Sequence, residues 1–272
     1  MRGASRASLI AAKERLSAAL AGGTAAQANE VGDQLLAVVG LLDREPGLRR
    51  SLSDPSRERS ARTGLADALL AGKISATTLG LVTELVGARW SEPGDLTDAG
   101  EQLAVLAIAE AADSEGELDE LEDELFRFGR IVQGNPGLRS ALSNQFVPEE
   151  GRSAVVTELV SGKVSASALR LITQAAAHSR GRSLDAVLES YASLAAELRE
   201  RLVAEVHVAV PLSNEQRDRL AAALVAAYGH DVHLNVVIDP EMIGGVSVRI
   251  GDELINGSIA SRLADLRRGL AA

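Results

Sequence analysis

The sequence predicts a mainly α-helical chain: two tandem helical bundles followed by a small α+β domain with a short sheet. Three observations predict this fold. Alanine and leucine dominate, and aromatic residues make up only 2% of the chain, which favours amphipathic helices because these residues lose little side-chain freedom in a helix. A segment repeats at a fixed offset of 90 residues, and after about residue 204 the apolar pattern becomes alternating. We therefore expect domains at 1–102, 103–203 and 204–272.

The repeat is visible in turn residues as well as apolar ones. Pro46–Arg49 (PGLR) recurs without a gap as Pro136–Arg139, and Gly72-Lys73 recurs as Gly162-Lys163. A register kept over this distance indicates that one helical unit was duplicated.

In the first copy, apolar residues at helical spacing define the elements in order. The chain breaks at Pro46-Gly47 and again at Pro55, Gly72 is a natural left-handed residue after a helix end, and Ser75 can cap the next helix. The expected helices cover Ser5–Leu20, Ala26–Leu42, a stretch through Leu65, Leu69 and Leu70 that ends at Gly72, and a stretch from Ser75 through Leu79, Val82 and Val86.

The helix from about Leu96 to Ala112 belongs to both copies. Its Leu106 and Ala109 align with Leu16 and Ala19 of the first helix at the 90-residue offset. It therefore closes the first bundle and opens the second. The second copy then continues through Leu118–Val132, Pro136–Leu142, Val155–Val160, Ser165–Ala177 and Ser183 to about Leu202.

The last 70 residues or so alternate strands and helices. Glu205–Val210 alternates and is rich in β-branched residues, which predicts a strand that ends at Pro211. Further strands are expected at Asp231–Asp239, Val246–Ile250 and Glu253–Ile255, and helices at Asn214–Tyr228 and Ser258–Leu270.

Bulk properties exclude several classes of function. The formal net charge is −10 and no basic stripe is interleaved with aromatic residues, so nucleic acid is not an expected partner. There is no cysteine, which excludes disulfides and thiolate metal sites. The N-terminal segment lacks the apolar core of a secretory signal, and no window approaches the roughly 20 apolar residues of a membrane span. Any membrane association must go through a partner.

No motif for catalysis, a cofactor or a metal is found. A phosphate-binding loop needs a glycine five residues before a Gly-Lys pair, where this chain has Asp67 and Thr157. The four histidines are not arranged with carboxylates as a metal site requires. Interhelical turns explain both Gly-Lys pairs.

An acidic run from Glu110 to Glu124 contains no basic residue. It does not match a calcium loop, because the sixth position counted from Asp113 is Leu118 and not glycine. Two interpretations stay open: a solvated helix face with its turn, or a docking surface for a basic helix.

The C-terminal segment carries a specific family resemblance. The stretches that carry it are Val206–Ser213 (VHVAVPLS), Tyr228-Gly229-His230, Ile238–Gly245 (IDPEMIGG), Val248–Asp252 (VRIGD) and Asn256–Ile259 (NGSI). Their order and spacing resemble the C-terminal signature of the δ subunit of F-type ATP synthase, the oligomycin-sensitivity-conferring protein family. Asn256 departs from the aspartate usual there, a mild change at a turn. The resemblance covers roughly 101–272, and the first copy looks like the addition found in long actinobacterial members.

This resemblance implies a static, non-catalytic role. The family links the α3β3 head to the peripheral stalk and resists the torque of rotation. The implied partners are N-terminal helices of the α subunits and the b-type stalk chains, with the β subunit as a further candidate, and no cofactor. The implied location is the cytoplasmic face of the cell membrane, with membrane contact only through the complex.

The resemblance also implies partner-binding residues. An α-subunit helix would lie in a groove between the first and fifth helices of the bundle, whose walls in the second copy are Leu106, Ile108, Leu169 and Ile172. Their alternative role is bundle core. The stalk would be held partly by the last helix, which carries Ile259, Leu263, Leu266 and Leu270 on one stripe.

Two other classes of function stay open. A free-standing helical-repeat adaptor would use the same duplicated bundle, although the C-terminal strand signature argues against it. An enzyme would need a convergent polar pocket that the sequence does not show.

Overall fold

The computed structural model describes residues 3–144, 147–201, 203–228, 233–239, 242, 244–250 and 253–256. The chain divides into two compact units, a helical unit (1–196) and a C-terminal unit (197–272). The first is built of helices and the second of a four-stranded sheet with a helix, which confirms the predicted fold class. Both copies of the repeat lie within the helical unit.

The first copy contains five helices that precede the shared one. Their bounds are α1 Ala4–Leu20, α2 Ala25–Arg44, α3 Pro46–Ser53, α4 Arg59–Leu70 and α5 Ala76–Gly87. Local chemistry sets the ends. Thr24 and Gln27 form a reciprocal capping box at the start of α2, and Ser75 accepts from the Thr78 backbone to cap α5. Gly72 after α4 has φ +74°, as its C-terminal role predicts.

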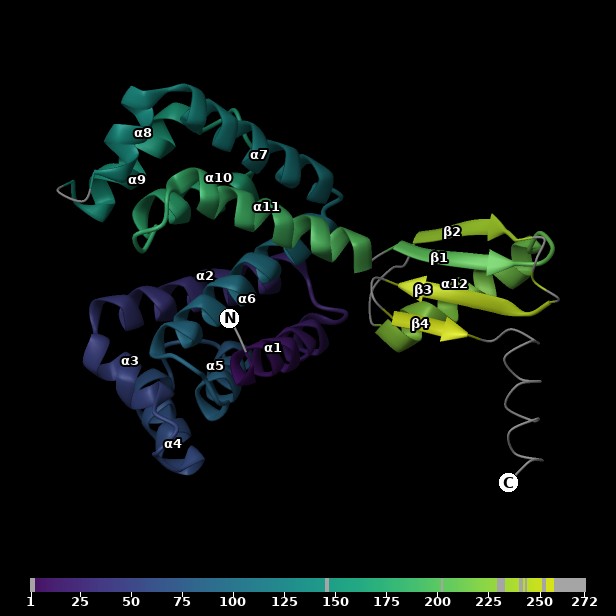
Figure 1. Cartoon of the computed structure of the whole chain (residues 1–272), viewed down its shortest axis with the longest axis horizontal. Helices are drawn as coiled ribbons and strands as arrows, with labels where there is room; N and C mark the ends of the chain where they lie inside the picture. The colour runs from purple at the N-terminus through teal and green to yellow at the C-terminus, as the bar shows by residue number, and fades with distance from the viewer. Residues whose placement is uncertain are drawn as a thin grey trace. The chain divides into compact units, whose positions relative to one another are not determined.

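The shared helix is α6, Pro93–Ser114, which starts three residues before the predicted Leu96 because Pro93 occupies its first turn. It packs against α1, α2, α3 and α5 of the first copy and against α7 and α10 of the second (Figure 1). The second copy continues with α7 Leu118–Gly134, α8 Pro136–Ser143, α9 Glu149–Val160, α10 Ala166–Ala177 and α11 Leu184–Arg201. Every residue from Leu103 to Ala109 is buried, as a helix enclosed on all sides requires.

The duplication extends to polar contacts between helices. In the first copy the Gln34 side chain accepts from the Ser75 backbone, and in the second copy Glu124, 90 residues on, accepts from the Ser165 backbone. Arg62 donates to the carbonyl oxygens at the end of α5, and its counterpart in the second copy does the same at the end of α10. In each copy, therefore, the side chain at the Gln34 position binds the start of the fifth helix, and the arginine at the Arg62 position binds its end.

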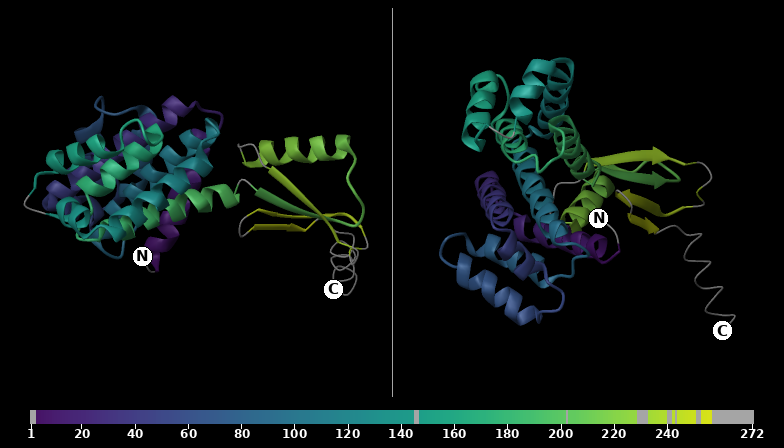
Figure 2. Two further views of the ribbon diagram at one scale, coloured as in Figure 1. Left: turned by 90° about the horizontal axis from the view of Figure 1, so that it is seen from above. Right: turned by 60° about the vertical axis from the view of Figure 1, so that its left-hand side comes forward.

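The C-terminal unit contains a mixed sheet. Its elements are β1 Val203–Val208, α12 Asn214–Tyr228, β2 His233–Ile238, β3 Val246–Ile250 and β4 Glu253–Asn256, in the order β2-β1-β3-β4. β1 and β2 are parallel, so α12 serves as the crossover between them, while β3 pairs antiparallel with β1 and β4. Figure 2 shows α12 lying along one face of the sheet.

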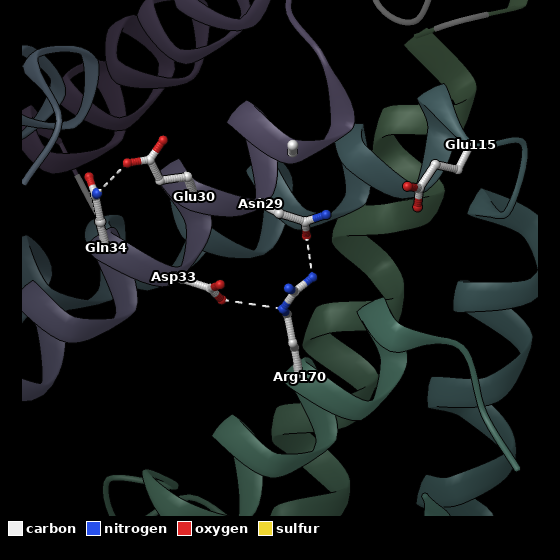
Figure 3. A pocket seen from close by; sticks show the side chains of 7 residues that line it. Asn29, Glu30, Asp33, Gln34, Glu115 and Arg170 are labelled. Carbon is white, nitrogen blue, oxygen red and sulfur yellow. Dashed lines mark hydrogen bonds and ion pairs between the residues drawn. The ribbon is translucent and has the colours of Figure 1, made fainter. Parts of the chain in front are cut away.

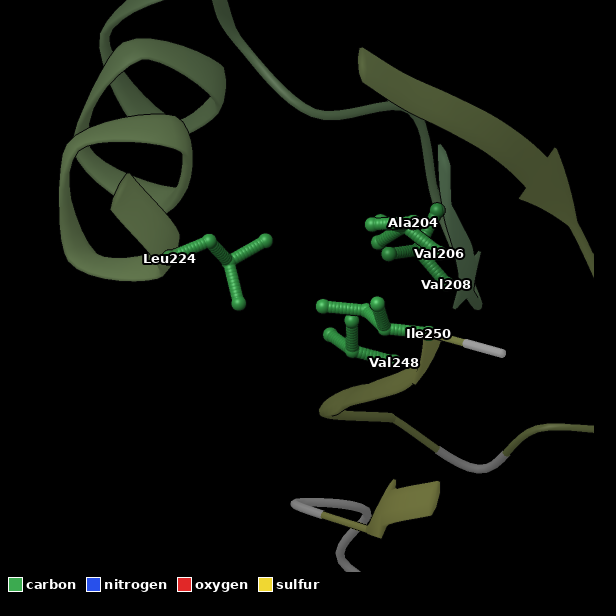
Figure 4. Packing of buried hydrophobic residues seen from close by; sticks show 6 residues of the cluster. All are labelled: Ala204, Val206, Val208, Leu224, Val248 and Ile250. Atoms are coloured by element: carbon green, nitrogen blue, oxygen red, sulfur yellow. The ribbon is translucent and has the colours of Figure 1, made fainter. Parts of the chain in front are cut away.

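A small apolar core joins α12 to the sheet. Ala204, Val206 and Val208 point to one face of β1 because side chains alternate along a strand, and Leu224 of α12 packs over them (Figure 4). β1 begins two residues before the predicted strand and ends at Val208. Val210, which the alternation placed in the strand, is 69% exposed in the turn that follows. The predicted helix Ser258–Leu270 lies outside the described residues.

Candidate interaction surfaces

The four groove residues expected in the second copy lie on α6 and α10. Ile108 and Ile172 are fully buried, Leu106 is 6% exposed, and Leu169 is half-buried. Three of the four therefore contact their own chain. The stalk residues expected on the last helix, Ile259, Leu263, Leu266 and Leu270, lie outside the described residues.

The first copy's α2 covers this part of α6. A Cβ placed on Gly32 would lie 2.6 Å from Cγ1 of Ile108 and 3.2 Å from the carbonyl oxygen of Ala104. Seven residues further along α2, Val39 sits 2.9 Å from where a Cβ on Gly100 would be. The two helices run antiparallel and touch through glycines, which allow a backbone approach that any side chain would prevent.

α2 also makes polar contacts with α10 and with the residues that follow it. Arg170 of α10 donates to the Asn29 side chain at 2.7 Å and pairs with Asp33 at 3.5 Å (Figure 3). At the other end of α2, His178 approaches Gly40, and Arg180 pairs with Asp43 at 3.8 Å. α2 therefore packs on α6 and is linked to α10 and to the loop after it through these side-chain contacts. Beside Arg170, between α2 and α10, lies an open cleft of about 510 Å³ that is lined mainly by α2 side chains.

A buried ionic cluster fixes the two copies together. Glu101 of α6 is 3% exposed, and its carboxylate accepts hydrogen bonds from Arg180, Arg182 and the hydroxyl of Tyr191. These donors belong to the α10–α11 loop and to α11. Burial raises the pKa of Tyr191 above its ordinary value, so the hydroxyl stays protonated as a donor.

Arg180 is the centre of this cluster. It has φ +50°, a left-handed conformation that costs a non-glycine residue about 1–3 kcal/mol. Its guanidinium meets carboxylates of both α2 and α6: Asp43, Asp98 and Glu101. Burial raises the pKa of Asp43, an effect that Arg180, Arg49 and His178 oppose. The ionic contacts tie the second copy's loop to the first copy's α2 and to α6.

Sequence reasoning missed this cluster. Glu101 is 79 to 90 residues from its three donors along the chain, so no local spacing brings them together. One signal was present: Glu101 lies two residues before the apolar run Leu103–Ala109, and its equivalent one repeat later is Tyr191.

The described residues show little that could do chemistry. No three His, Asp or Glu side chains among them are grouped to hold a metal ion. His178 pairs with Glu149 at 3.4 Å, and His207 with Glu205 at 3.2 Å. Within the part of the chain that the structure describes, no helix is both long and apolar enough to cross a membrane.

In the C-terminal unit, large apolar side chains are exposed at the ends and edge of the sheet. They are Val210 (69%), Leu254 (55%), Ile238 (52%) and Ile255 (43%). The sheet face away from Leu224 carries Glu205, His207 and Arg249, with Arg249 paired to Glu205 at 4.0 Å. A chain with stacked helical repeats and a sheet unit that exposes apolar side chains belongs to the class of scaffold proteins that bind other proteins.

Comparison with known proteins identifies the family. Residues 105–270 match the model of the ATP synthase delta (OSCP) subunit family. Curated relatives, each called ATP synthase subunit delta, are 50% identical in Streptomyces avermitilis (99% of this chain and 98% of the relative) and 47% identical in Thermobifida fusca (100% of both). A chain in the cryo-EM structure of the Toxoplasma gondii mitochondrial ATP synthase hexamer matches with 19% identity and a TM-score of 0.31, over 62% of this chain and 95% of that one.

The chain therefore belongs to the ATP synthase delta (OSCP) subunit family. It is a non-catalytic subunit of ATP synthase, whose catalytic sites lie on other subunits, and it associates with the membrane peripherally through the complex.

Proposed function

We propose that this chain links the α3β3 head of the ATP synthase to the b-type stalk helices and so resists the torque of rotation. The observation that carries the proposal is the ionic cluster around Arg180, which holds the two copies together. A static link under load must transmit force without hinging, and the two bundle copies share one buried helix and a buried ionic cluster. The head side of the link uses amphipathic helices of the α subunit, recognised in a helix-lined groove.

The stalk side uses the C-terminal unit. The exposed apolar residues Leu254 and Ile255 support this assignment, since exposed apolar patches mark protein-interaction sites. In sequence they are followed by the segment 258–272, which contains Ile259, Leu263, Leu266 and Leu270. The complex would hold the chain at the cytoplasmic face of the cell membrane, with the β subunit as a further neighbour.

Affinity purification of the tagged chain from native membranes tests the proposal. The α, β and b-type chains should co-purify. Truncation after Gly257 should remove the b-type chains while α and β stay bound. A truncated chain that keeps normal helicity and still retains the b-type chains would contradict the stalk assignment. An intact chain that purifies without α and β would contradict the head assignment.

A further inference from the structure

A cleft of about 500 Å³ in the first copy takes no part in the contacts described so far. It is formed by α3, the loop between α3 and α4, the turn between α5 and α6, and the first residue of α6. Its lining residues fall between 47 and 93, whereas the family match begins at residue 105. A cleft of this volume is large enough to hold a small molecule or a few residues of a peptide.

Two arginine side chains at this cleft have little or no ionic partner. Arg50 of α3 is exposed, and its guanidinium forms no hydrogen bond or ion pair with any residue that the structure describes. Its neighbour Arg49, by contrast, pairs with Asp43 at 3.3 Å. The side chain of Arg57 is 52% exposed, and the ion pair that it forms with Asp54 spans 4.0 Å. Both guanidinium groups can therefore bind an external anion.

Asp54 is the acidic residue of the cleft lining, and its own turn partly satisfies its charge. Its carboxylate accepts hydrogen bonds from the backbone N–H of Ser56 at 2.9 Å and from the hydroxyl of Ser56 at 2.7 Å. These hydrogen bonds lower the pKa of Asp54, so the carboxylate is ionised at neutral pH. Two arginines against one aspartate leave the lining positive, on a chain whose formal net charge is −10.

The cleft also has an apolar part. Trp90 is 3% exposed, as expected for a residue at the base of the cleft, and its indole N–H donates to the Leu85 carbonyl oxygen at 2.8 Å. The two prolines of the lining, Pro55 and Pro93, are exposed and have no N–H group. The cleft therefore combines apolar contact area with two guanidinium groups.

The second copy shows that the fold itself does not require these arginines. One repeat later, the position of Arg50 is Ser140 and the position of Arg57 is Val147. The same two helices still form there, as α8 and α9. The positive charge at the cleft is therefore a property of the first copy alone and calls for an explanation other than folding.

We propose that this cleft binds an acidic segment of a neighbouring protein, with a carboxylate held by Arg50 and Arg57 and an adjoining apolar side chain placed against Trp90 and the two prolines. Charge complementarity identifies the occupant, since guanidinium groups pair with carboxylates through charge-assisted hydrogen bonds. The site goes beyond the proposed function, which assigns no partner to this part of the first copy.

The lining favours a carboxylate over a phosphate group. Phosphate sites commonly add backbone N–H groups from a helix N-terminus. At the start of α6 the backbone N–H groups of Glu92 and Asp95 are already engaged in a reciprocal capping box. The ionised Asp54 also repels a doubly charged phosphate more strongly than a singly charged carboxylate.

The test uses the full-length chain, because its single tryptophan lies in the cleft and reports directly on the site. A short peptide of alternating glutamate and leucine, blocked at both ends, should give a saturable change in Trp90 emission. A lysine–leucine peptide should give none. Combining Arg50→Gln with Arg57→Gln should weaken binding by about tenfold or more, as the loss of charge-assisted hydrogen bonds implies.

The matched control combines Arg15→Gln with Lys73→Gln, which removes two exposed basic residues of the first copy that lie outside the cleft. Its affinity should stay within about twofold of the wild type, because exposed charges beyond a Debye length are screened. Circular dichroism verifies that both double variants are folded.

The outcomes each decide the proposal. Absence of a saturable change with the acidic peptide, or unchanged binding in the Arg50 and Arg57 double variant, overturns the site. Equal loss in the control overturns it as well, because binding would then follow overall charge. Inorganic phosphate that binds more tightly than the peptide at equal ionic strength overturns the peptide assignment. None of these results bears on the head and stalk contacts, which co-purification tests separately.

Discussion

Glu101 and Tyr191 occupy equivalent positions of the repeat, 90 residues apart, and their side chains meet: the Tyr191 hydroxyl donates to the Glu101 carboxylate. The contact arises because α6 is at once the last helix of one copy and the first of the next. In the second bundle α6 faces α11, and α11 is the helix that corresponds to α6 one repeat later. Another pair of residues 90 positions apart, Ser5 of α1 and Asp95 of α6, also meets in the first copy, with a hydrogen bond of 2.6 Å.

Glu101→Gln should destabilise the helical unit by about 3–5 kcal/mol, because it leaves Arg180 and Arg182 beside a neutral group in a buried site. Urea denaturation followed by circular dichroism measures the change. Asp98→Asn is the matched control, because the Asp98 side chain is 50% exposed and pairs with the same Arg180, and should cost about 1 kcal/mol or less. Equal costs for the two variants would contradict the role of Glu101 as the buried anchor.

Gly32→Ala should destabilise the chain by about 1–3 kcal/mol, because its Cβ would fall 2.6 Å from Ile108 and force α2 away from α6. Gly64→Ala is the control. Gly64 lies within α4 with nothing near its missing Cβ, so alanine there should stabilise by about 0.5–1 kcal/mol. Thermal unfolding of both variants gives the comparison. If Gly32→Ala left the stability unchanged, a close backbone contact between α2 and α6 at Gly32 would be contradicted.

Tyr191 should make stability fall at alkaline pH. Its folded-state pKa is raised by burial above the ordinary value near 10, so the folded chain holds this proton more tightly than the unfolded chain does. The contribution to stability is complete below pH 10 and is lost as pH rises beyond it, at about 1.4 kcal/mol per pH unit. Tyr191→Phe should reduce this slope. Denaturation at several pH values above 10 checks it, and an unchanged slope would contradict the assignment.

Arg62→Ala should cost about 1–3 kcal/mol for each carbonyl group left without a partner. Its guanidinium donates to the carbonyl oxygens of Val86 at 2.5 Å and Ala88 at 2.8 Å, and its residue is 4% exposed. Arg57→Ala removes an arginine whose side chain is 52% exposed and whose ion pair spans 4.0 Å, so it should cost less than about 1 kcal/mol. Chemical denaturation distinguishes them, and similar losses would contradict a capping role for Arg62.

The sequence by itself determined the repeat, the helices and most of their ends, because each depends on local spacing or on a capping residue such as Ser75 or Gly72. The strand bounds of β1 were less well predicted. Val210 continues the alternation of β1, but pairing with β2 and β3 stops at Val208, and pairing is a property of the sheet.

Tertiary structure alone decided which face of α6 is covered, and by what. The middle of α6, Leu103–Ala109, is apolar on all sides, so its pattern does not distinguish the face that meets α2 from the face that meets the second copy. Ile108, which the resemblance suggests as a groove wall, packs against Gly32 of α2. The Arg180 cluster also depends on the tertiary structure. Coulomb attraction acts between charged groups that the fold brings together, whatever their separation along the chain.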